Sequence, residues 1–502
     1  MTIFSGSLAL SVQIVSAVVL ARLITPRDFG LVTMVTTFSL LLSNASTNGF
    51  TDAVIQREEI NHGLASSLFW VNVCIGALLA LLFAASGPLV AKFYGEAAVT
   101  HIVAGISGAI FITSLSALHL ALLKRSMNYT AAAANEIIGR VIGVSTAIGF
   151  AWAGWGYWSL VCGAYALAVS MTIGAWILCS WVPGRPRRLP GTGSVLQFAS
   201  HISGRFTVNY FARNSDNLLI GWRFGAYSLG FYKKAYDLFA LSATQLVSAT
   251  SNVAVSALSR VRNDRPQYFR YLLGAIGVMA FLGMGLAGDL TLVGKDLIRV
   301  LLGPGWEPAG RTFTFFAPGI GIMIVYGIHG WIHVSIGRAD RWFRWGIVEW
   351  VVTSALFLIG LAWGPEGFAL AWCLSFWILT IPAMWYAGQP IGLGMGPIVS
   401  VVWRYILASL IAGLTTELIL YKVVALSQAQ GTRGAALRLG LVTAMFAFFY
   451  LAAIVVLHRS TEPLRILVKL FREVTSGVGF GKRSDVAAVE SETGEMEVSE
   501  AR

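Results

Sequence analysis

The chain has 502 residues, of which 56% are hydrophobic and only 12% are charged, and its mean hydropathy is +0.71. Soluble globular proteins carry about 25% charged residues, so the composition excludes an ordinary soluble domain. The formal net charge of +12 is typical of a membrane protein whose basic residues set topology and contact anionic lipid, because no basic region with interleaved aromatic residues is present. We predict an integral membrane protein with membrane lipids around it and no nucleic-acid partner.

Apolar windows long enough to cross a bilayer recur along the chain to about residue 457. A transmembrane helix needs about 20 mostly apolar residues. The windows are continuously apolar, without the alternation of barrel strands, which favours an all-α bundle. We predict about fourteen transmembrane helices, over residues 3–21, 29–50, 64–85, 101–122, 131–151, 157–178, 200–221, 229–255, 271–290, 312–333, 343–362, 368–387, 404–424 and 436–457.

The loops on one side of the predicted bundle are the richer in Lys and Arg. They carry Lys124, Arg125, Arg185, Arg187, Arg188, Arg260, Arg262, Arg265, Arg270, Arg338 and Arg341, and Arg459, Arg465, Lys469 and Arg472 follow in the tail. The positive-inside bias therefore places both termini in the cytoplasm. The bias is moderate, since Arg22, Arg27, Lys233, Lys234, Lys295 and Arg299 fall on the opposite side.

A faint internal repeat divides the bundle. The stretch 21–32 (ARLITPRDFGLV) resembles 221–232 (GWRFGAYSLGFY), and Gly30 and Gly230 occupy the same place in it. Transporters are often built from two related halves around a central site, although two short turns can also be alike by chance. We predict two pseudo-repeated lobes: residues 1–199 with six helices and their cytoplasmic connection, and residues 200–457 with about eight, which helix seven (200–221) opens. Residues 458–502 form a cytoplasmic tail that turns acidic after 482 and is predicted to be disordered.

Polar residues follow one face of helix seven. Arg205, Asn209, Arg213 and Asp216 recur at helical spacing within an apolar window. Charges inside a membrane usually face a bundle interior or a wet cavity. Arg213 and Asp216 are three residues apart and can form a structural ion pair, but one Asp cannot neutralise two Arg residues. The excess positive charge favours an anionic substrate, especially a phosphate.

Helix five contains Glu136 and Arg140, four residues apart, which permits an intrahelical salt bridge. A structural pair and a cavity role both fit this spacing. Glu349 and Glu417 have no basic residue at i±3 or i±4 and are candidates for ion coupling.

Two histidines, His329 and His333, have the i, i+4 spacing of metal ligands. Position 330 is Gly, so the zinc-protease motif fails, and we favour a hydrogen-bonding or proton-coupling role over a metal. We expect no metal and no cofactor. No catalytic constellation appears, and no loop exceeds about 23 residues, so there is no room for a soluble catalytic domain. The chain is predicted to be a carrier and not an enzyme.

Several segments resemble polysaccharide flippases of the Wzx and PST type, which belong to the MOP superfamily. The resemblance rests on LARLITPRDFG (20–30), GFTDAVIQR (49–57), SLFWVN (67–72), NYFARNSDNLLIG (209–221) and LGFYKKAY (229–236). These segments cover the first half of the chain, and the second half matches by helix count and loop pattern.

The resemblance implies a bacterial inner-membrane protein with fourteen helices in two lobes that works by alternating access. Its substrate would be an undecaprenyl-diphosphate-linked oligosaccharide, turned toward the periplasm for exopolysaccharide, capsule or O-antigen (lipopolysaccharide) synthesis. Arg205, Arg213 and Arg140 are the candidates to hold the diphosphate, with Asn209 and Asp216 beside them. Arg57 and Arg22 are secondary candidates at cavity mouths. Partners would include polysaccharide polymerase and co-polymerase proteins.

Two alternatives remain open. A multidrug exporter of the same superfamily would favour acidic cavity residues, whereas this chain offers more arginines. A membrane polysaccharide polymerase or ligase generally needs a sizeable periplasmic loop, and the longest outward connection here, about 291–311, is modest.

Overall fold

The computed structural model describes residues 2–56, 61–185, 192–422 and 431–460, and every regular element in these ranges is helical. The α-helices are α1 (Thr2–Leu23), α2 (Pro26–Gln56), α3 (His62–Tyr94), α4 (Ala98–Ser114), α5 (Ala117–Arg125), α6 (Tyr129–Trp152), α7 (Tyr157–Leu178), α8 (Thr192–Arg260), α9 (Arg265–Leu302), α10 (Glu307–Phe316), α11 (Pro318–Ser335), α12 (Ala339–Gly360), α13 (Gly364–Gly388), α14 (Met395–Lys422) and α16 (Gly431–His458). Short 3₁₀ turns follow α12 and α13, at Leu361–Trp363 and Gln389–Ile391.

The all-α membrane architecture predicted from hydropathy is confirmed. Within the described residues the predicted apolar windows lie on helices, apart from short turns at 115–116 and 317. Nine helices of these ranges are long and apolar enough to cross a bilayer, or ten when the bent pair α10 and α11 counts as one span. Large apolar side chains such as Leu81, Leu89, Leu414 and Val456 are exposed on the surface of the bundle. In a membrane these side chains meet lipid, which explains why the chain needs so few charges.

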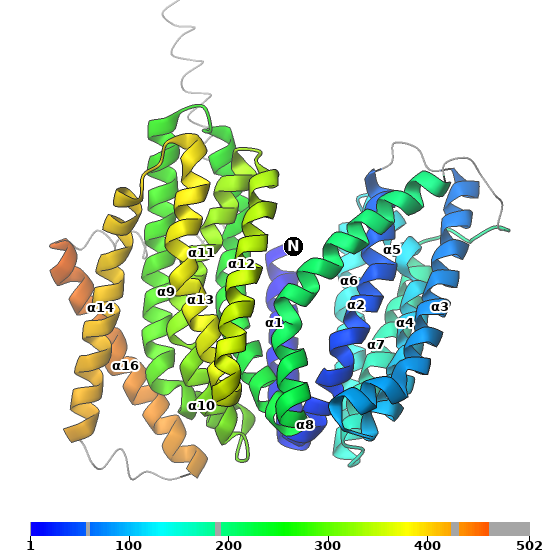
Figure 1. Ribbon diagram of the computed structural model, residues 1–502, viewed down its shortest axis with the longest axis horizontal. Coiled ribbons are helices and arrows are strands. Elements are labelled where there is room, and N and C mark those ends of the chain that lie inside the picture. Colours follow the sequence, from blue (N-terminus) through cyan, green and yellow to red (C-terminus); the bar gives the residue numbers. More distant parts are fainter. Residues whose placement is uncertain (1, 57–60, 186–191, 423–430, 461–502) are drawn as a thin grey trace, which may run out of the picture.

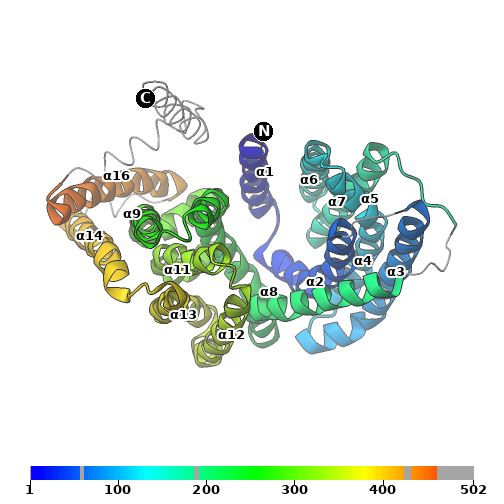
Figure 2. The ribbon, with the colours of Figure 1, turned by 90° about the horizontal axis from the view of Figure 1, so that it is seen from above.

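The helices form two lobes (Figure 1). Helices α2 to α7 lie in one lobe, α9 to α14 and α16 lie in the other, and α1 and α8 run between them. The view from above in Figure 2 shows α8 passing along both lobes. The two-lobe prediction is therefore confirmed.

The helices of the two lobes follow one another along the chain in the same order. In each, a long helix (α3 or α9) ends at a glycine of positive φ, Gly95 (φ 69°) or Gly303 (φ 92°). Each is followed by a broken pair (α4 and α5, α10 and α11) and then by two helices joined at a glycine, Gly154 (φ 81°) or Gly364 (φ 69°). The pair α1 and α2 corresponds to the two parts of α8, which bends at Gly225. Helices α14 and α16 have no counterpart in the first lobe.

The two related glycines of the sequence repeat meet in space. A Cβ atom on Gly30 would overlap the carbonyl oxygen of Ala226, and a Cβ atom on Gly230 would overlap the carbonyl oxygen of Pro26. The contact is reciprocal, because positions 26 and 30 correspond to 226 and 230. Only glycine permits helices α2 and α8 to approach this closely.

Side chains from both repeats surround this crossing. The indole N–H of Trp306 donates to the carbonyl of Ala21 (2.8 Å), and the Trp306 ring packs edge-on against Phe29 and Phe231, with centroids 5.7 Å from each. Trp306 is buried. It therefore joins the end of α1 and the start of α2 to the start of α10.

The two unmatched helices are fastened to α9. The Arg438 guanidinium of α16 pairs with the Asp296 carboxylate at 2.5 Å, with both side chains about one-fifth exposed. Thr443 donates to Asp289 (3.2 Å), and Ser409 of α14 donates to the Met284 carbonyl (2.8 Å). Helices α14 and α16 therefore belong to the second lobe.

Candidate functional site

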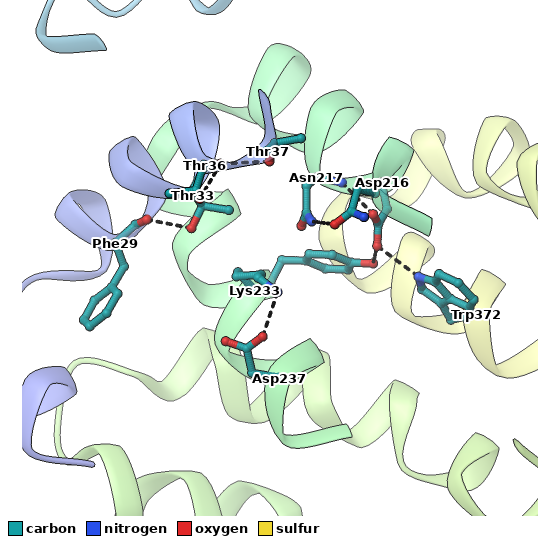
Figure 3. Close-up of polar contacts among 11 residues, drawn as sticks. Phe29, Thr33, Thr36, Thr37, Asp216, Asn217, Lys233, Asp237 and Trp372 are labelled. Atoms are coloured by element: carbon teal, nitrogen blue, oxygen red, sulfur yellow. Dashed lines mark hydrogen bonds and ion pairs between the residues drawn. The ribbon is translucent and has the colours of Figure 1, made fainter. Parts of the chain in front are cut away.

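The kink of α8 brings distant polar residues together. Gly225 has φ 79° and ψ 179°, a backbone conformation that glycine adopts readily. The helical ladder is interrupted there, so the part that carries Asp216 folds back beside the part that carries Tyr232 and Lys233. This bend produces the polar cluster drawn in Figure 3.

Asp216 is the centre of the cluster. One carboxyl oxygen, Oδ2, accepts hydrogen bonds from the Tyr232 hydroxyl (2.7 Å) and from the Trp372 indole N–H (3.0 Å). The other, Oδ1, accepts from the backbone N–H of Asn217 (2.8 Å). Asp216 is 1% exposed. A buried carboxyl group is stable only with such donors, and these tie both parts of α8 to α13.

A second polar layer lies beside Asp216 on α8. The Asn217 amide donates to Asn214 Oδ1 (3.4 Å), and the Asn214 amide donates to the Tyr210 carbonyl (3.0 Å). Asn217 Oδ1 is buried without a hydrogen-bond partner among the described residues. Unsatisfied amide oxygens of this kind are uncommon inside proteins, so this one is a candidate acceptor for a water or a ligand donor.

Two lysines follow the kink. The Lys233 ammonium pairs with the Asp237 carboxylate at 2.7 Å and lies 5.2 Å from the centre of the Tyr236 ring. Its side chain is 30% exposed. The Lys234 ammonium lies 4.0 Å from the centre of the Phe29 ring of α2. Both lysines lie inside α8, within the predicted helix 229–255.

Hydroxyl groups occupy the related positions of α2. Thr33 donates to the Phe29 carbonyl (2.7 Å), and Thr37 and Thr36 donate to the Thr33 carbonyl (2.8 and 3.3 Å). Figure 3 shows them on the stretch of α2 that lies beside α8. In the repeat, Thr33 and Thr37 correspond to Lys233 and Asp237. One lobe therefore contributes neutral hydroxyls where the other contributes an ion pair.

Of the four polar residues predicted on one face of helix seven, Asp216 is the one whose side chain the structure describes. Arg205, Asn209 and Arg213 belong to α8, but their side chains lie outside the described part, and Arg57 lies outside the described residues altogether. The described partners of Asp216 are Tyr232, Trp372 and Asn217. Trp372 stands 156 positions from Asp216, so only the folded chain reveals that contact.

Arg22 occupies a helix end. Its guanidinium donates to the carbonyls of Val300 (2.6 Å) and Leu301 (3.3 Å) in the last turn of α9. These are among the carbonyls that lack a partner within a helix, and a cation suits the negative end of the helix dipole. Arg22 thus joins α1 to the second lobe.

The remaining charged candidates lie elsewhere. The predicted intrahelical pair is present, since Arg140 contacts Glu136 at 2.7 Å, and both side chains are about half exposed. Glu349 is partly buried in α12, and Glu417 is exposed in α14. No ion pair involves either glutamate within the described residues, and no recorded contact joins them or Arg140 to Asp216.

The two histidines of α11 are buried among aromatic rings. His329 lies 4.5 Å from the Tyr326 ring and 6.0 Å from the His333 ring, and His333 lies 5.9 Å from the Tyr386 ring. The His329 Nδ1 atom is 2.5 Å from the Tyr326 carbonyl oxygen. In the described part of the chain, no group of three His, Cys, Asp or Glu side chains is placed to hold a metal.

A protein-family model described as "Polysaccharide biosynthesis protein" matches residues 19–311. The succinoglycan biosynthesis transport protein ExoT of Rhizobium meliloti (strain 1021) is 22% identical over 386 residues, 76% of this chain and 78% of the relative. The lipopolysaccharide biosynthesis protein WzxC of Escherichia coli (strain K12) is 21% identical over 395 residues, 75% of this chain and 77% of the relative.

Among solved structures, the lipid II flippase MurJ in an inward closed conformation resembles the whole bundle. The TM-score is 0.72, with 14% sequence identity, over 91% of this chain and 98% of that chain. At this identity the likeness concerns the fold alone. It covers more of the chain than the family model, which ends at residue 311.

Proposed function

Because the chain belongs to the polysaccharide biosynthesis protein family, we propose that this multi-pass protein of the bacterial inner membrane is a flippase for a lipid-linked oligosaccharide. The substrate would carry an undecaprenyl-diphosphate anchor and move from the cytoplasmic to the periplasmic leaflet, for exopolysaccharide, capsule or lipopolysaccharide synthesis. The names of ExoT and WzxC support a polysaccharide pathway, and the MurJ-like fold supports a lipid-linked cargo.

The observation that carries the proposal is the polar cluster at the kink of α8. A diphosphate and hydrated sugars cannot cross hydrocarbon unless polar groups replace their water. The cluster combines the partly exposed Lys233 side chain of α8 with hydroxyls of α2, the helix that packs against α8. We assign Lys233 to the diphosphate, together with Arg205 and Arg213, whose positions on α8 precede the kink.

Other residues take supporting roles in this proposal. Asn209 and Asp216 would orient the basic side chains, and Arg22, Arg57 and Arg140 would attract the substrate at the ends of the pathway. Glu349, Glu417, His329 and His333 remain candidates for ion coupling. We place the lobe boundary near residue 200, both termini in the cytoplasm, and polymerase and co-polymerase proteins as the partners that receive the cargo.

A transport cycle follows from the crossing of Gly30 and Gly230. The lobes touch there, so we propose that they rock about this contact and expose the cluster alternately to each side of the membrane. The chain would then be a transporter and not an enzyme, since the sugar–lipid bond is neither made nor broken.

The first test is deletion in the native host, with lipid-linked saccharides and surface polysaccharide measured together. The flippase predicts loss of polymer and accumulation of the complete lipid-linked repeat on the cytoplasmic face. Normal polysaccharide with altered drug sensitivity would instead identify a multidrug exporter, and an unpolymerised repeat on the periplasmic face would identify a polymerase.

The residue assignment needs a separate test. Lys233→Ala and Arg213→Ala should each abolish export at normal protein levels, while Lys233→Arg and Arg213→Lys should retain part of it. Lys92→Ala, which removes an exposed lysine at the end of α3, is the matched control. If both substitutions at one position leave export intact, that side chain has no part in diphosphate binding.

A further inference from the structure

One end of the second lobe carries an excess of arginine. Exposed Arg260, Arg262, Arg265, Arg270 and Arg344 lie at the α8–α9 turn and at the starts of α9 and α12; we name these five residues the arginine face. No ion pair involves any of them among the described residues. Figure 1 shows the α8–α9, α11–α12 and α13–α14 connections together at the upper end of this lobe.

Side-chain contacts join these connections into one surface. The Tyr268 hydroxyl lies 2.7 Å from the Ser335 hydroxyl, which ties the start of α9 to the end of α11. The Arg265 guanidinium lies beside Gly392, in the turn before α14. Arg341 donates to the Tyr386 carbonyl (2.7 Å), which ties the start of α12 to the end of α13.

The nearby carboxylates are already engaged. Asp264 caps α9 by accepting from the Gln267 N–H (3.1 Å), and Asp340 pairs with Arg338 at 3.1 Å. Among the described residues, Asp264 and Asp340 are the acidic side chains in the turns that carry the arginine face. The arginine face therefore keeps a net positive charge that nothing on the described surface balances.

The chain itself contains a complementary segment. Residues 485–500 hold six carboxylates and no basic residue: Asp485, Glu490, Glu492, Glu495, Glu497 and Glu500. Helix α16, which leads to this segment, ends at His458, whose ring lies 5.0 Å from the Tyr405 ring of α14. A flexible chain of the length of residues 461–484 spans about 25–30 Å. Tyr405 lies ten residues, about 15 Å of helix, from the start of α14, and the turn before α14 contacts Arg265, so the acidic segment is within reach of the arginine face.

We propose that the acidic segment 485–500 docks on the arginine face of its own chain. Each exposed pair contributes little alone, about 0–1 kcal/mol, but several pairs held by one tether act together, because the tether keeps their effective concentration high. The docked segment covers the positive surface at that end of the second lobe. Under the proposed function, it would compete there with an anionic substrate or lipid headgroup.

The test uses the full-length protein with a fluorescent amino acid at Ser491, reconstituted in phosphatidylcholine nanodiscs. At low salt the probe should be immobilised, with high anisotropy. Raising the salt to about 0.5 M should release it, because the Debye length falls well below the ~10 Å that applies at 0.1 M. Replacing the five arginines by Gln should release the probe at low salt.

A matched variant removes equal charge elsewhere. It replaces Lys92, Arg223, Lys295, Arg311 and Arg433 by Gln, all of which are exposed and lie outside the arginine face. This variant should keep the probe immobilised. A third variant, with the six carboxylates changed to amides, leaves the bundle untouched and should release the probe, which separates lost docking from misfolding.

Several results would overturn the proposal. One is a probe that is mobile in wild-type protein at low salt, and another is an anisotropy that the arginine substitutions leave unchanged. A third is that the arginine variant loses only the retention of phosphatidylglycerol in mixed nanodiscs while the probe signal stays constant. In that last case the arginine face binds lipid headgroups and not the acidic segment.

Discussion

Gly30 and Gly230, two hundred residues apart, each lie against a carbonyl oxygen that belongs to the other's repeat, Ala226 for the first and Pro26 for the second. The two contacts are equivalent because the two repeats have related sequences and fold alike. It places the closest approach of α2 and α8 at the point where both repeats turn.

We expect Gly30→Ala and Gly230→Ala to destabilise this crossing, because a methyl group would push against backbone. Overpacking of this kind typically costs about 1–3 kcal/mol, and the two costs should not add, since one substitution already separates the helices. Thermal unfolding of the purified protein measures the effect. Gly413→Ala is the control, because a Cβ there meets nothing within 4 Å. Equal stability of the Gly30 and Gly413 variants would contradict the prediction.

The Asp216 cluster predicts coupled effects. Tyr232→Phe and Trp372→Phe each remove one donor to the same oxygen, Oδ2. Leaving a buried polar group short of a partner costs about 1–3 kcal/mol, so each variant should unfold at lower temperature and the double variant should show a pairwise coupling energy. Tyr227→Phe removes an exposed phenol and should change nothing. Strict additivity of the two substitutions would mean that the donors act independently.

Arg22 and Arg27 offer a matched comparison. Arg22 caps the last turn of α9, whereas Arg27 forms an ion pair with Glu96 (3.0 Å) in which the Arg27 side chain is 62% exposed. A charged hydrogen bond at a helix end contributes about 1 kcal/mol or more, and an exposed pair about 0–1 kcal/mol. Arg22→Ala should therefore lower the unfolding temperature more than Arg27→Ala. Lost export without lost stability would instead assign Arg22 to the substrate.

The Asp296–Arg438 pair should hold α16 against α9. Arg438→Ala leaves a carboxylate in a mostly buried place, at a cost of about 1–3 kcal/mol, and hydrogen exchange of α16 should accelerate. Exchanging the two residues, Asp296→Arg with Arg438→Asp, should restore part of the protection. Glu136→Ala, in the exposed pair with Arg140, serves as the comparison. A rate that stays unchanged in Arg438→Ala would show that packing alone retains the helix.

Hydropathy and the repeat predicted the all-helical bundle and its two lobes, because both depend on patterns within short stretches of sequence. The Asp216 cluster depends instead on which helices meet. Nothing near position 216 indicates Trp372, which lies in another helix 156 positions away. The family-like segment 229–236 contains Tyr232, but only the bend at Gly225 explains why the Tyr232 hydroxyl reaches Asp216.

Because α14 and α16 are held against α9, the two lobes occupy unequal areas of the bilayer plane. Any rotation of one lobe against the other has to displace lipid, and the lobe with two more helices sweeps a larger area. Lipid opposes the motion of the smaller lobe less. The smaller lobe should therefore rotate farther, while the larger lobe stays nearly fixed. The asymmetry of the motion would then originate from helices that lie far from the polar cluster.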